Sequence, residues 1–205
     1  MKVSVVTIIA LTAALSGTAR GQASDAGGSI SGAVSFDGKV PAMKKLAISK
    51  DLAACDLHEK FSEECIVSPT GGLKNVFVQV LGAKGEMPVT KERPTLVQRG
   101  CQFMPHIQVI AAGSRMNIMN EDGVAHNLHT LSEKNPSFNR LQPGIKKRMV
   151  TKKNDLVIPE IVAVKCDLHG WMKAWIIVAD HPQRRDGHIE VALLDRLHKR
   201  LSWWY

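Results

Sequence analysis

The sequence predicts an all-β sandwich, and three observations support this fold class. Short stretches rich in valine and isoleucine recur along the chain, and turn residues such as Asp37-Gly38 and Thr70-Gly71-Gly72 separate them. No long helical periodicity is present before residue 188, and no repeat of about 20–50 residues is found. With 205 residues the chain can bury a sizeable core, so we expect the strands to pack as two sheets.

The expected strands follow one another with short turns between them. They are predicted at 30–36, 65–67, 75–81, 95–98, 103–110, 116–120, 124–131, 149–158, 161–166 and 173–178. Within them, Pro105 marks a sheet edge or a bend. Residues 132–145 contain two prolines and no periodicity, so they are predicted as a long loop. Near the end of the chain we expect a turn and strand at 186–192, followed by helical spacing at 193–201.

The first 23 residues have the features of a signal peptide. A basic start precedes an apolar run over residues 3–15, and Gly21-Gln22-Ala23 has the small-x-small pattern of a cleavage site. The run is shorter than the ~20 apolar residues of a membrane-spanning helix. We therefore expect cleavage after Ala23, a periplasmic or otherwise exported protein, and no stable membrane span in the mature chain. This divides the chain into a signal peptide at 1–23, a domain at 24–182 and a basic tail at 183–205.

The chain is basic, with a formal net charge of +8. Removal of residues 1–23 leaves 25 basic and 19 acidic residues, a net charge of +6. Part of this excess lies at 146–153 and at 184–200. A basic surface can steer an acidic partner protein or associate with an anionic membrane surface, but a solvated basic face is the favoured explanation for each patch taken alone. The export signal and the lack of a recognition motif argue against nucleic-acid binding.

One short segment carries three soft metal ligands. Cys166, His169 and Met172 have the spacing C-x2-H-x2-M between two predicted strands. Thiolate, imidazole and thioether together favour copper, whereas zinc binds cysteine and histidine but rarely methionine. A mononuclear blue-copper site needs two histidines, one cysteine and a weak axial methionine, so a second histidine must come from elsewhere. A dinuclear copper centre would need two cysteines in this segment, which has one.

His126 is the best candidate for the second histidine. It follows a predicted strand and turn, where a side chain can point into a site built by loops at one end of a sandwich. The neighbouring Asn127 could hydrogen-bond to the segment around Cys166 and fix the orientation of the ligands. His129 lies three residues further on and points to the other face of a strand, so it is not expected to bind metal. His106 is expected to be structural.

Taken together, these motifs resemble the cupredoxins, and among them the plastocyanin and amicyanin type. The matching motifs are Phe103-x-Pro105, Val109-x3-Gly113, Asn120-x-Asp122, His126-Asn127 and Cys166-x2-His169-x2-Met172. The resemblance covers residues 101–180 closely and the earlier strands loosely. It implies a Greek-key β-sandwich of cupredoxin type, with an N-terminal strand extension and a C-terminal tail, that holds one type 1 copper ion. It also implies that His126, Cys166, His169 and Met172 are the four ligands. Gly170 stands where amicyanin-like segments usually carry proline.

Three cysteines remain when Cys166 is assigned to the metal. At most one internal disulfide can form among them, and one thiol is left over. An exported protein resides where disulfides persist. We expect Cys101 to pair with Cys55 or with Cys65, and the sequence weakly favours Cys55.

The resemblance and the ligand set predict an electron carrier rather than an enzyme, because no second metal site and no substrate base is visible. His169 is expected at the rim, with its ring edge as the electron exit. Trp171 is expected to shield the copper or to present an apolar contact surface to redox partner proteins, acidic ones included. Copper storage or transfer by a chaperone is an alternative, although the methionine-rich or multiple-histidine tracts that would support it are absent. A structural envelope sandwich with a vestigial site is a further alternative.

Overall fold

The computed structural model describes residues 33–80, 92–144, 148–180, 189–193 and 201–202. Its regular elements are α1 (Leu52–Cys55), β1 (Val76–Val80), β2 (Thr95–Arg99), β3 (Gln102–Met104), β4 (Ile107–Ala111), β5 (Asn117–Asn120), β6 (His126–Leu131), β7 (Asn139–Gln142), β8 (Arg148–Val150), β9 (Glu160–Lys165), β10 (Lys173–Ala179), β11 (Ile189–Leu193) and β12 (Leu201–Ser202). The expected signal peptide at 1–23 and most of the expected helical spacing at 193–201 lie outside the described residues.

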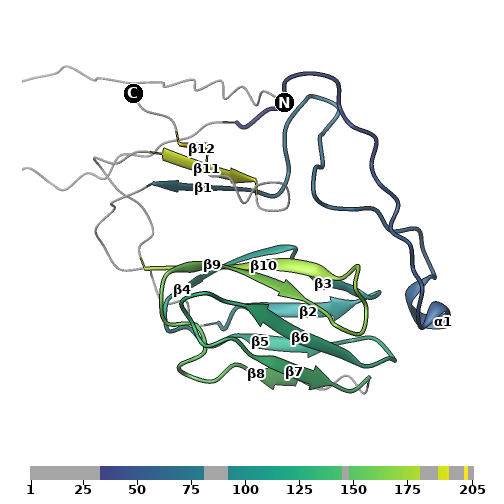
Figure 1. Ribbon diagram of the computed structural model, residues 1–205, viewed down its shortest axis with the longest axis vertical. Helices are drawn as coiled ribbons and strands as arrows, with labels where there is room; N and C mark the ends of the chain where they lie inside the picture. Colours follow the sequence, from purple (N-terminus) through teal and green to yellow (C-terminus); the bar gives the residue numbers. More distant parts are fainter. Residues whose placement is uncertain (1–32, 81–91, 145–147, 181–188, 194–200, 203–205) are drawn as a thin grey trace, which may run out of the picture.

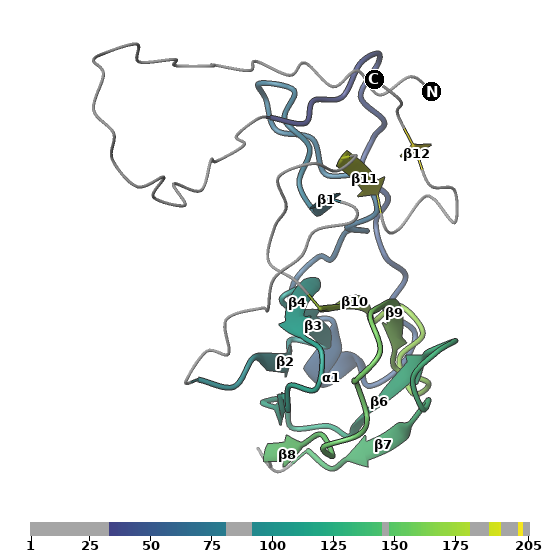
Figure 2. The same cartoon turned by 90° about the vertical axis from the view of Figure 1, so that its left-hand side faces the viewer.

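Two mixed sheets form a sandwich, which confirms the predicted fold class (Figure 1). The five-stranded sheet has the order β4-β10-β9-β6-β7, and the four-stranded sheet has the order β3-β2-β5-β8. Each contains one parallel pair, β10 with β4 and β2 with β5. Figure 2 shows the two sheets facing each other across the core.

The core between the sheets follows from the alternation of side chains along each strand. Val162 and Val164 of β9 are buried, and they pair in register with Ile176 and Ala174 of β10. On the opposite sheet, Leu96 of β2 is fully buried in the same core cluster. Burial of one such aliphatic side chain stabilises the fold by about 1.5–3 kcal/mol. The sandwich therefore provides a stable framework for the loops at its ends.

The strand predictions need three corrections. The stretches at 65–67 and at the described part of 30–36 form only isolated bridges, Val67 with Leu73 and Ser35 with Gly72. The loop predicted at 132–145 contains β7, an edge strand whose sequence Asn-Arg-Leu-Gln has no apolar alternation to indicate it. The stretch predicted at 149–158 is a strand only over β8, at its beginning. At Pro105 the chain bends between β3 and β4, which belong to different sheets.

A third sheet lies apart from the sandwich and has the order β1-β11-β12. In it, β1 pairs antiparallel with β11, and β11 pairs with β12. Strand β1 therefore pairs with the segment that the sequence analysis assigned to a tail, and both sandwich sheets are built from strands between residues 95 and 179.

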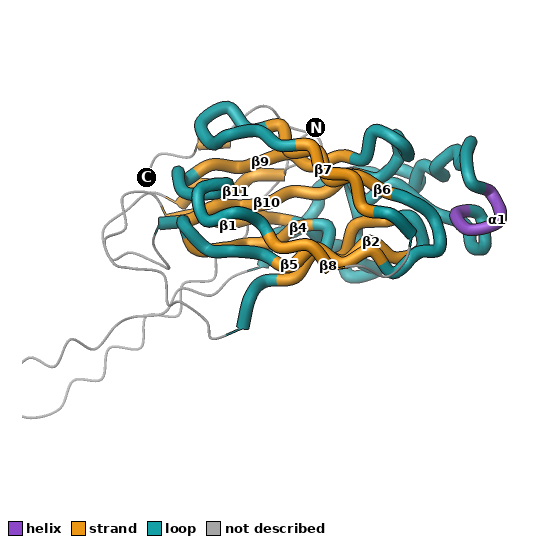
Figure 3. The backbone as a smooth tube through the Cα atoms, turned by 90° about the horizontal axis from the view of Figure 1, so that it is seen from below, coloured by secondary structure: helices purple, strands orange, loops and turns teal. Residues whose placement is uncertain are grey.

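The N-terminal segment, described from residue 33, carries α1 to one end of the sandwich (Figure 3). There a disulfide joins Cys55 to Cys101, the pairing that the sequence weakly favoured. Among the described residues, no helix combines the length and the apolar character that crossing a membrane requires.

Candidate metal centre

Neighbouring strands bring the expected ligands together at this end of the sandwich. His126 is the first residue of β6, and Cys166 directly follows β9, the strand that pairs with β6. His169 and Met172 lie in the short loop from β9 to β10. That loop is closed by backbone hydrogen bonds from Met172 N to His169 O and from Cys166 N to Met172 O, at 2.9 and 3.1 Å. All four side chains are buried.

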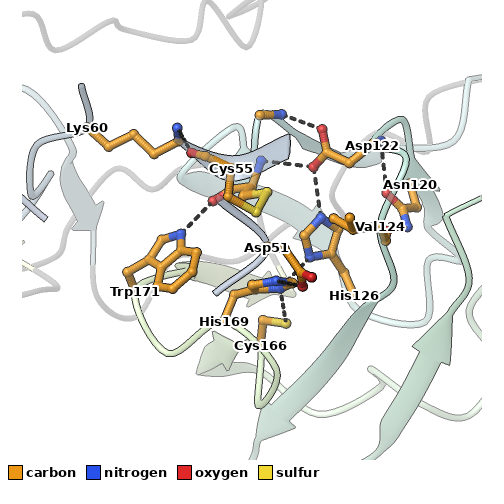
Figure 4. Close-up of a disulfide and its surroundings, with 12 residues drawn as sticks. Asp51, Cys55, Lys60, Asn120, Asp122, Val124, His126, Cys166, His169 and Trp171 are labelled. Atoms are coloured by element: carbon orange, nitrogen blue, oxygen red, sulfur yellow. Dashed lines mark hydrogen bonds and ion pairs between the residues drawn. A yellow bond between two sulfur atoms is a disulfide. The ribbon is translucent and has the colours of Figure 1, made fainter. Parts of the chain in front are cut away.

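The donor atoms of three of these residues converge. The two Nδ1 atoms of His126 and His169 face each other at 2.9 Å, and Sγ of Cys166 lies 3.7 Å from Nδ1 of His169 (Figure 4). The ligand atoms of the three residues all lie within 4.8 Å of one another. Met172 is buried in the same core cluster as Cys166. The two nitrogens and the Cys166 sulfur are close enough to bind one ion, since metal–nitrogen and metal–sulfur bonds are about 2.0–2.3 Å long.

Carboxylates hold the outer nitrogens of both rings. Nε2 of His126 lies 2.8 Å from Oδ2 of Asp122, and Nε2 of His169 lies 2.8 Å from Oδ2 of Asp51. An ionised carboxylate only accepts hydrogen bonds, so each Nε2 carries a proton and donates it. Each Nδ1 of a neutral ring then presents a lone pair, and the two lone pairs face each other. Such a pair is unfavourable unless a proton or a cation lies between the rings, so the donor set fits a bound metal ion.

The ionisation of the two histidines differs. Burial lowers the pKa of His126, but its hydrogen bonds to Asp122 and Cys166 outweigh burial, and the net pKa is raised. Burial lowers the pKa of His169, and the charge of His126 adds to this, so its net pKa is lowered despite Asp51. Without a cation, His126 is therefore the ring that holds the proton between the two. A metal ion that binds here must displace that proton.

Asn127 joins the strand of His126 to the segment of Cys166. Its Oδ1 accepts hydrogen bonds from the backbone N–H groups of Asp167 and Leu168 at 2.7 and 3.3 Å, and it lies 3.2 Å from Sγ of Cys166. The Asn127 backbone N–H also points at that sulfur, at 3.5 Å. Burial raises the pKa of the Cys166 thiol, but the hydrogen bonds from His126 and from backbone groups outweigh it and lower the net pKa. The thiolate, which is the form that binds metals, is thus favoured.

Trp171 contacts the site from the side. Its Nε1 donates to the carbonyl of Cys101 at 3.1 Å, and its ring lies 5.1 Å from the ring of His169, centroid to centroid. His169 itself is fully buried. The expectation that its ring edge lies at the rim was therefore wrong, because Asp51 and Trp171 both pack against the ring.

Two carboxylates of the site were not assigned as site residues from the sequence. Asp122 appeared only within the resemblance motif, although its position four residues before His126 was an available signal. Asp51 gave no signal at all, because 118 residues separate it from His169.

The remaining histidines and cysteines lie outside the ligand group. Nδ1 of His129 contacts the carboxylate of Asp167 at 2.9 Å, in a partly exposed position. Nδ1 of His106 lies 3.1 Å from the carbonyl of Lys173. Cys101 is close to Asp122 and His126, but its sulfur is in the disulfide and cannot bind a metal. Cys65 is a free, partly exposed thiol.

No protein-family model and no curated protein sequence matches the chain. Solved structures do match it. A purple cupredoxin from Nitrosopumilus maritimus shows 15% identity and a TM-score of 0.36, over 42% of this chain and 99% of that one. Amicyanin from Paracoccus versutus shows 15% identity and a TM-score of 0.37, over 50% and 97%. A copper-containing nitrite reductase from Thermus scotoductus shows 22% identity and a TM-score of 0.39, over 51% and 25%.

The chain thus spans a quarter of the reductase and nearly the whole of the two smaller proteins. It is similar to amicyanin and other cupredoxins over about half its length. These are likenesses of fold, and its function is inferred from the site itself.

Proposed function

We propose that the chain is a type 1, or blue, copper protein that carries single electrons between redox partners in the periplasm or elsewhere outside the cytoplasm. The observation that supports this most is the approach of the Nδ1 atoms of His126 and His169 to 2.9 Å of each other, beside the sulfur of Cys166. Two imidazoles, one thiolate and a buried methionine are the ligand set of a blue-copper site.

Each residue has a defined part in this proposal. Bound copper supplies the one-electron Cu(II)/Cu(I) couple. Cys166 would provide a thiolate ligand, His126 and His169 two imidazole ligands, and Met172 a weak thioether ligand that tunes the potential. Asn127 keeps the thiolate in place, because its Oδ1 accepts from the backbone of the ligand loop and its own backbone N–H donates to the sulfur. Complete burial of both imidazoles keeps water from the metal position.

We propose that partner proteins contact the chain beside Trp171 rather than at His169, because the ring of His169 is fully buried. A surface pocket of about 170 Å³ borders Trp171 and Met172. It lies between the sandwich and the N-terminal segment, and Lys44 and Lys173 are among its lining residues. Glu63 and Glu64 also line it, so the charges of the pocket itself balance. The net charge of the chain, +6 without residues 1–23, suits an acidic partner protein.

Copper storage is a second candidate, and the same closure favours it. A fully buried His169 slows the exchange of copper with solvent or with another protein, which is useful in a protein that retains the metal. Storage does not require reversible reduction, so the two functions differ in whether the bound copper can be reduced and reoxidised repeatedly.

The test is to load the purified chain with Cu(II) and record its absorption. An electron carrier shows intense blue or green charge-transfer absorption, which disappears in Cys166→Ser and bleaches reversibly on reduction. Cys65→Ser is the matched control, since it removes the other free thiol and should leave the colour unchanged.

Three results would contradict electron transfer. Colourless protein with bound copper would favour storage, and equal colour in Cys166→Ser would place the metal elsewhere. Binding of zinc in preference to copper would also overturn the proposal, because Met172 suits copper.

A further inference from the structure

Asp51 makes an unusual contact for its position. It occupies the N-cap of α1, where an aspartate ordinarily accepts a hydrogen bond from a backbone N–H of the first turn. Here its side chain makes no such bond, and Oδ2 instead accepts from Nε2 of His169 at 2.8 Å. Its backbone has a φ of 51°, a left-handed conformation that is rare for residues other than glycine. A strained conformation of this kind persists where the surrounding structure enforces it.

One disulfide and several hydrogen bonds hold this segment against the metal centre. The Cys55–Cys101 disulfide ties α1 to the loop before β3. The backbone N–H of Cys101 donates to Asp122, the carboxylate that holds His126, at 2.8 Å. The buried amine of Lys60 donates to the carbonyl of Cys55. Figure 4 shows that both imidazoles are thereby joined to this disulfide, one through Asp51 and the other through Asp122.

The segment has two physical effects on His169. Asp51 lies against Nε2 of the ring, which has no exposed surface although the side chain of Asp51 itself is 37% exposed. It also places a negative charge at the nitrogen opposite the metal-binding one. A carboxylate that accepts from the outer N–H of a ligand histidine fixes the ring and makes it a stronger donor. A negative charge near the metal favours the ion of higher charge.

We propose that residues 51–55 form a lid of the metal centre and that Asp51 is its positioning residue. The lid closes the His169 ring to solvent and partners, and the Asp51 carboxylate holds the ring and stabilises Cu(II) relative to Cu(I). This inference rests on the proposed copper site for its effect on the metal, whereas closure of the ring belongs to the protein alone.

The first experiment measures the reduction potential of the copper-loaded full chain for Asp51→Asn. Asparagine keeps the size of the side chain and an oxygen that can accept from His169, but it removes the charge. We expect the ratio of Cu(I) to Cu(II) at a fixed potential to rise about tenfold, which equals about 59 mV for one electron. Asp56→Asn is the matched control, because it removes the same charge from an exposed residue of the same segment. Equal potentials in the two variants would overturn the role of Asp51.

The second experiment needs no metal. Diethyl pyrocarbonate modifies accessible histidines, and peptide mass spectrometry reports each site separately. In the copper-free chain we expect His169 to react at least tenfold more slowly than the exposed His58. Opening the disulfide, by reduction or in the double variant Cys55→Ser/Cys101→Ser, should bring His169 close to the rate of His58, while the core histidine His126 stays slow. Equal rates for His169 and His58 in the intact chain would show that no lid is closed.

The two experiments separate failure of this inference from failure of the proposed function. If the protein is blue and Asp51→Asn leaves its potential unchanged, the proposed function stands and the role of Asp51 is contradicted. If the chain binds no copper, the proposed function is contradicted, and the protection of His169 still decides whether the lid exists.

Discussion

The two histidines of the metal centre are supported by different parts of the chain. His126 is held by Asp122, four residues before it, in a turn that belongs to the sandwich. His169 is held by Asp51, which lies 118 residues away in the N-terminal segment. Both contacts join Nε2 to a carboxylate oxygen at 2.8 Å. Each histidine thus has a carboxylate at Nε2, from a neighbouring residue in the sequence for His126 and from a distant one for His169.

The surroundings of the two carboxylates differ in the same way. Asp122 also accepts hydrogen bonds from the backbone N–H groups of Gly100 and Cys101, at 2.6 and 2.8 Å. The turn that carries it is fixed by Asn120, whose Nδ2 donates to the carbonyl of Val124 at 2.9 Å. Asp51 has no comparable set of contacts from its side chain among the described residues. The His126 side is therefore part of the framework, and the His169 side depends on the lid.

Of the substitutions on the two sides of the site, Asp122→Ala should lower the free energy of unfolding most. It leaves two largely buried N–H groups without their acceptor, so we expect the free energy of unfolding of the copper-free chain to fall by about 2–4 kcal/mol. Asp51→Asn should cost less than about 1 kcal/mol, since the side chain is partly exposed. Urea unfolding followed by tryptophan fluorescence measures both values. Equal losses would mean that Asp51 belongs to the framework as much as Asp122 does.

Gly144→Ala should disturb the His126 side without changing any functional group. A Cβ at this position would lie 2.4 Å from backbone atoms of Gly123 and 2.5 Å from the backbone nitrogen of Val124, in the turn before His126. Since backbone must move, we expect a loss of about 1–3 kcal/mol in the free energy of unfolding.

Gly170→Ala is the control for that change, because it lies in the ligand loop itself and a Cβ there meets no atom within 4 Å. Its cost should stay within about 0.5 kcal/mol. Thermal unfolding of both variants measures the two losses of stability. A larger loss for Gly170→Ala than for Gly144→Ala would show that the ligand loop, and not the turn before His126, is the rigid part of the site.

Glu160→Gln probes a carboxylate at the opposite end of β9 from Cys166. Glu160 accepts hydrogen bonds from the backbone N–H groups of residues 133–135. Burial raises its pKa, but these bonds and the side chain of Asn135 outweigh burial and lower the net pKa. We expect the variant to lose about 1 kcal/mol at neutral pH, with unchanged copper affinity.

The pH dependence of this difference has a definite sign. Because the folded-state pKa of Glu160 is lowered, its contribution is complete above the unfolded pKa of about 4.3 and disappears as the pH falls through the folded value. Urea unfolding at a series of pH values should show wild type and Glu160→Gln converging in acid. A constant difference down to the lowest pH would contradict the assigned cause.

The sequence predicted those parts of the site whose signals are local. Cys166, His169 and Met172 are recognisable from their spacing in one loop, and His126 from its place after a strand and turn. The structure gathers these residues at one end of the sandwich, with Asn127 bridging to the same loop. The sandwich itself was predictable because valine and isoleucine mark the central strands β9 and β10.

The missed features depend on contacts between distant segments. Burial of His169 could not be foreseen, since the residue that covers it belongs to a stretch with no periodicity and no motif. The edge strand β7 forms through backbone pairing with β6, and its side chains carry little of that information. The strand that pairs with β1 could not be predicted either, because β11 begins 109 residues after the end of β1.

The free thiol of Cys65 means that Cys101 has two possible disulfide partners while the chain folds. Cys65 lies ten residues after Cys55, and both are synthesised before Cys101. Disulfides form and isomerise by thiolate attack, so the two cysteines compete for the same partner. In a chain that joined Cys65 to Cys101, α1 would lose its covalent link to the loop before β3. The pairing that forms therefore determines whether Asp51, at the start of α1, is tied covalently to the metal centre.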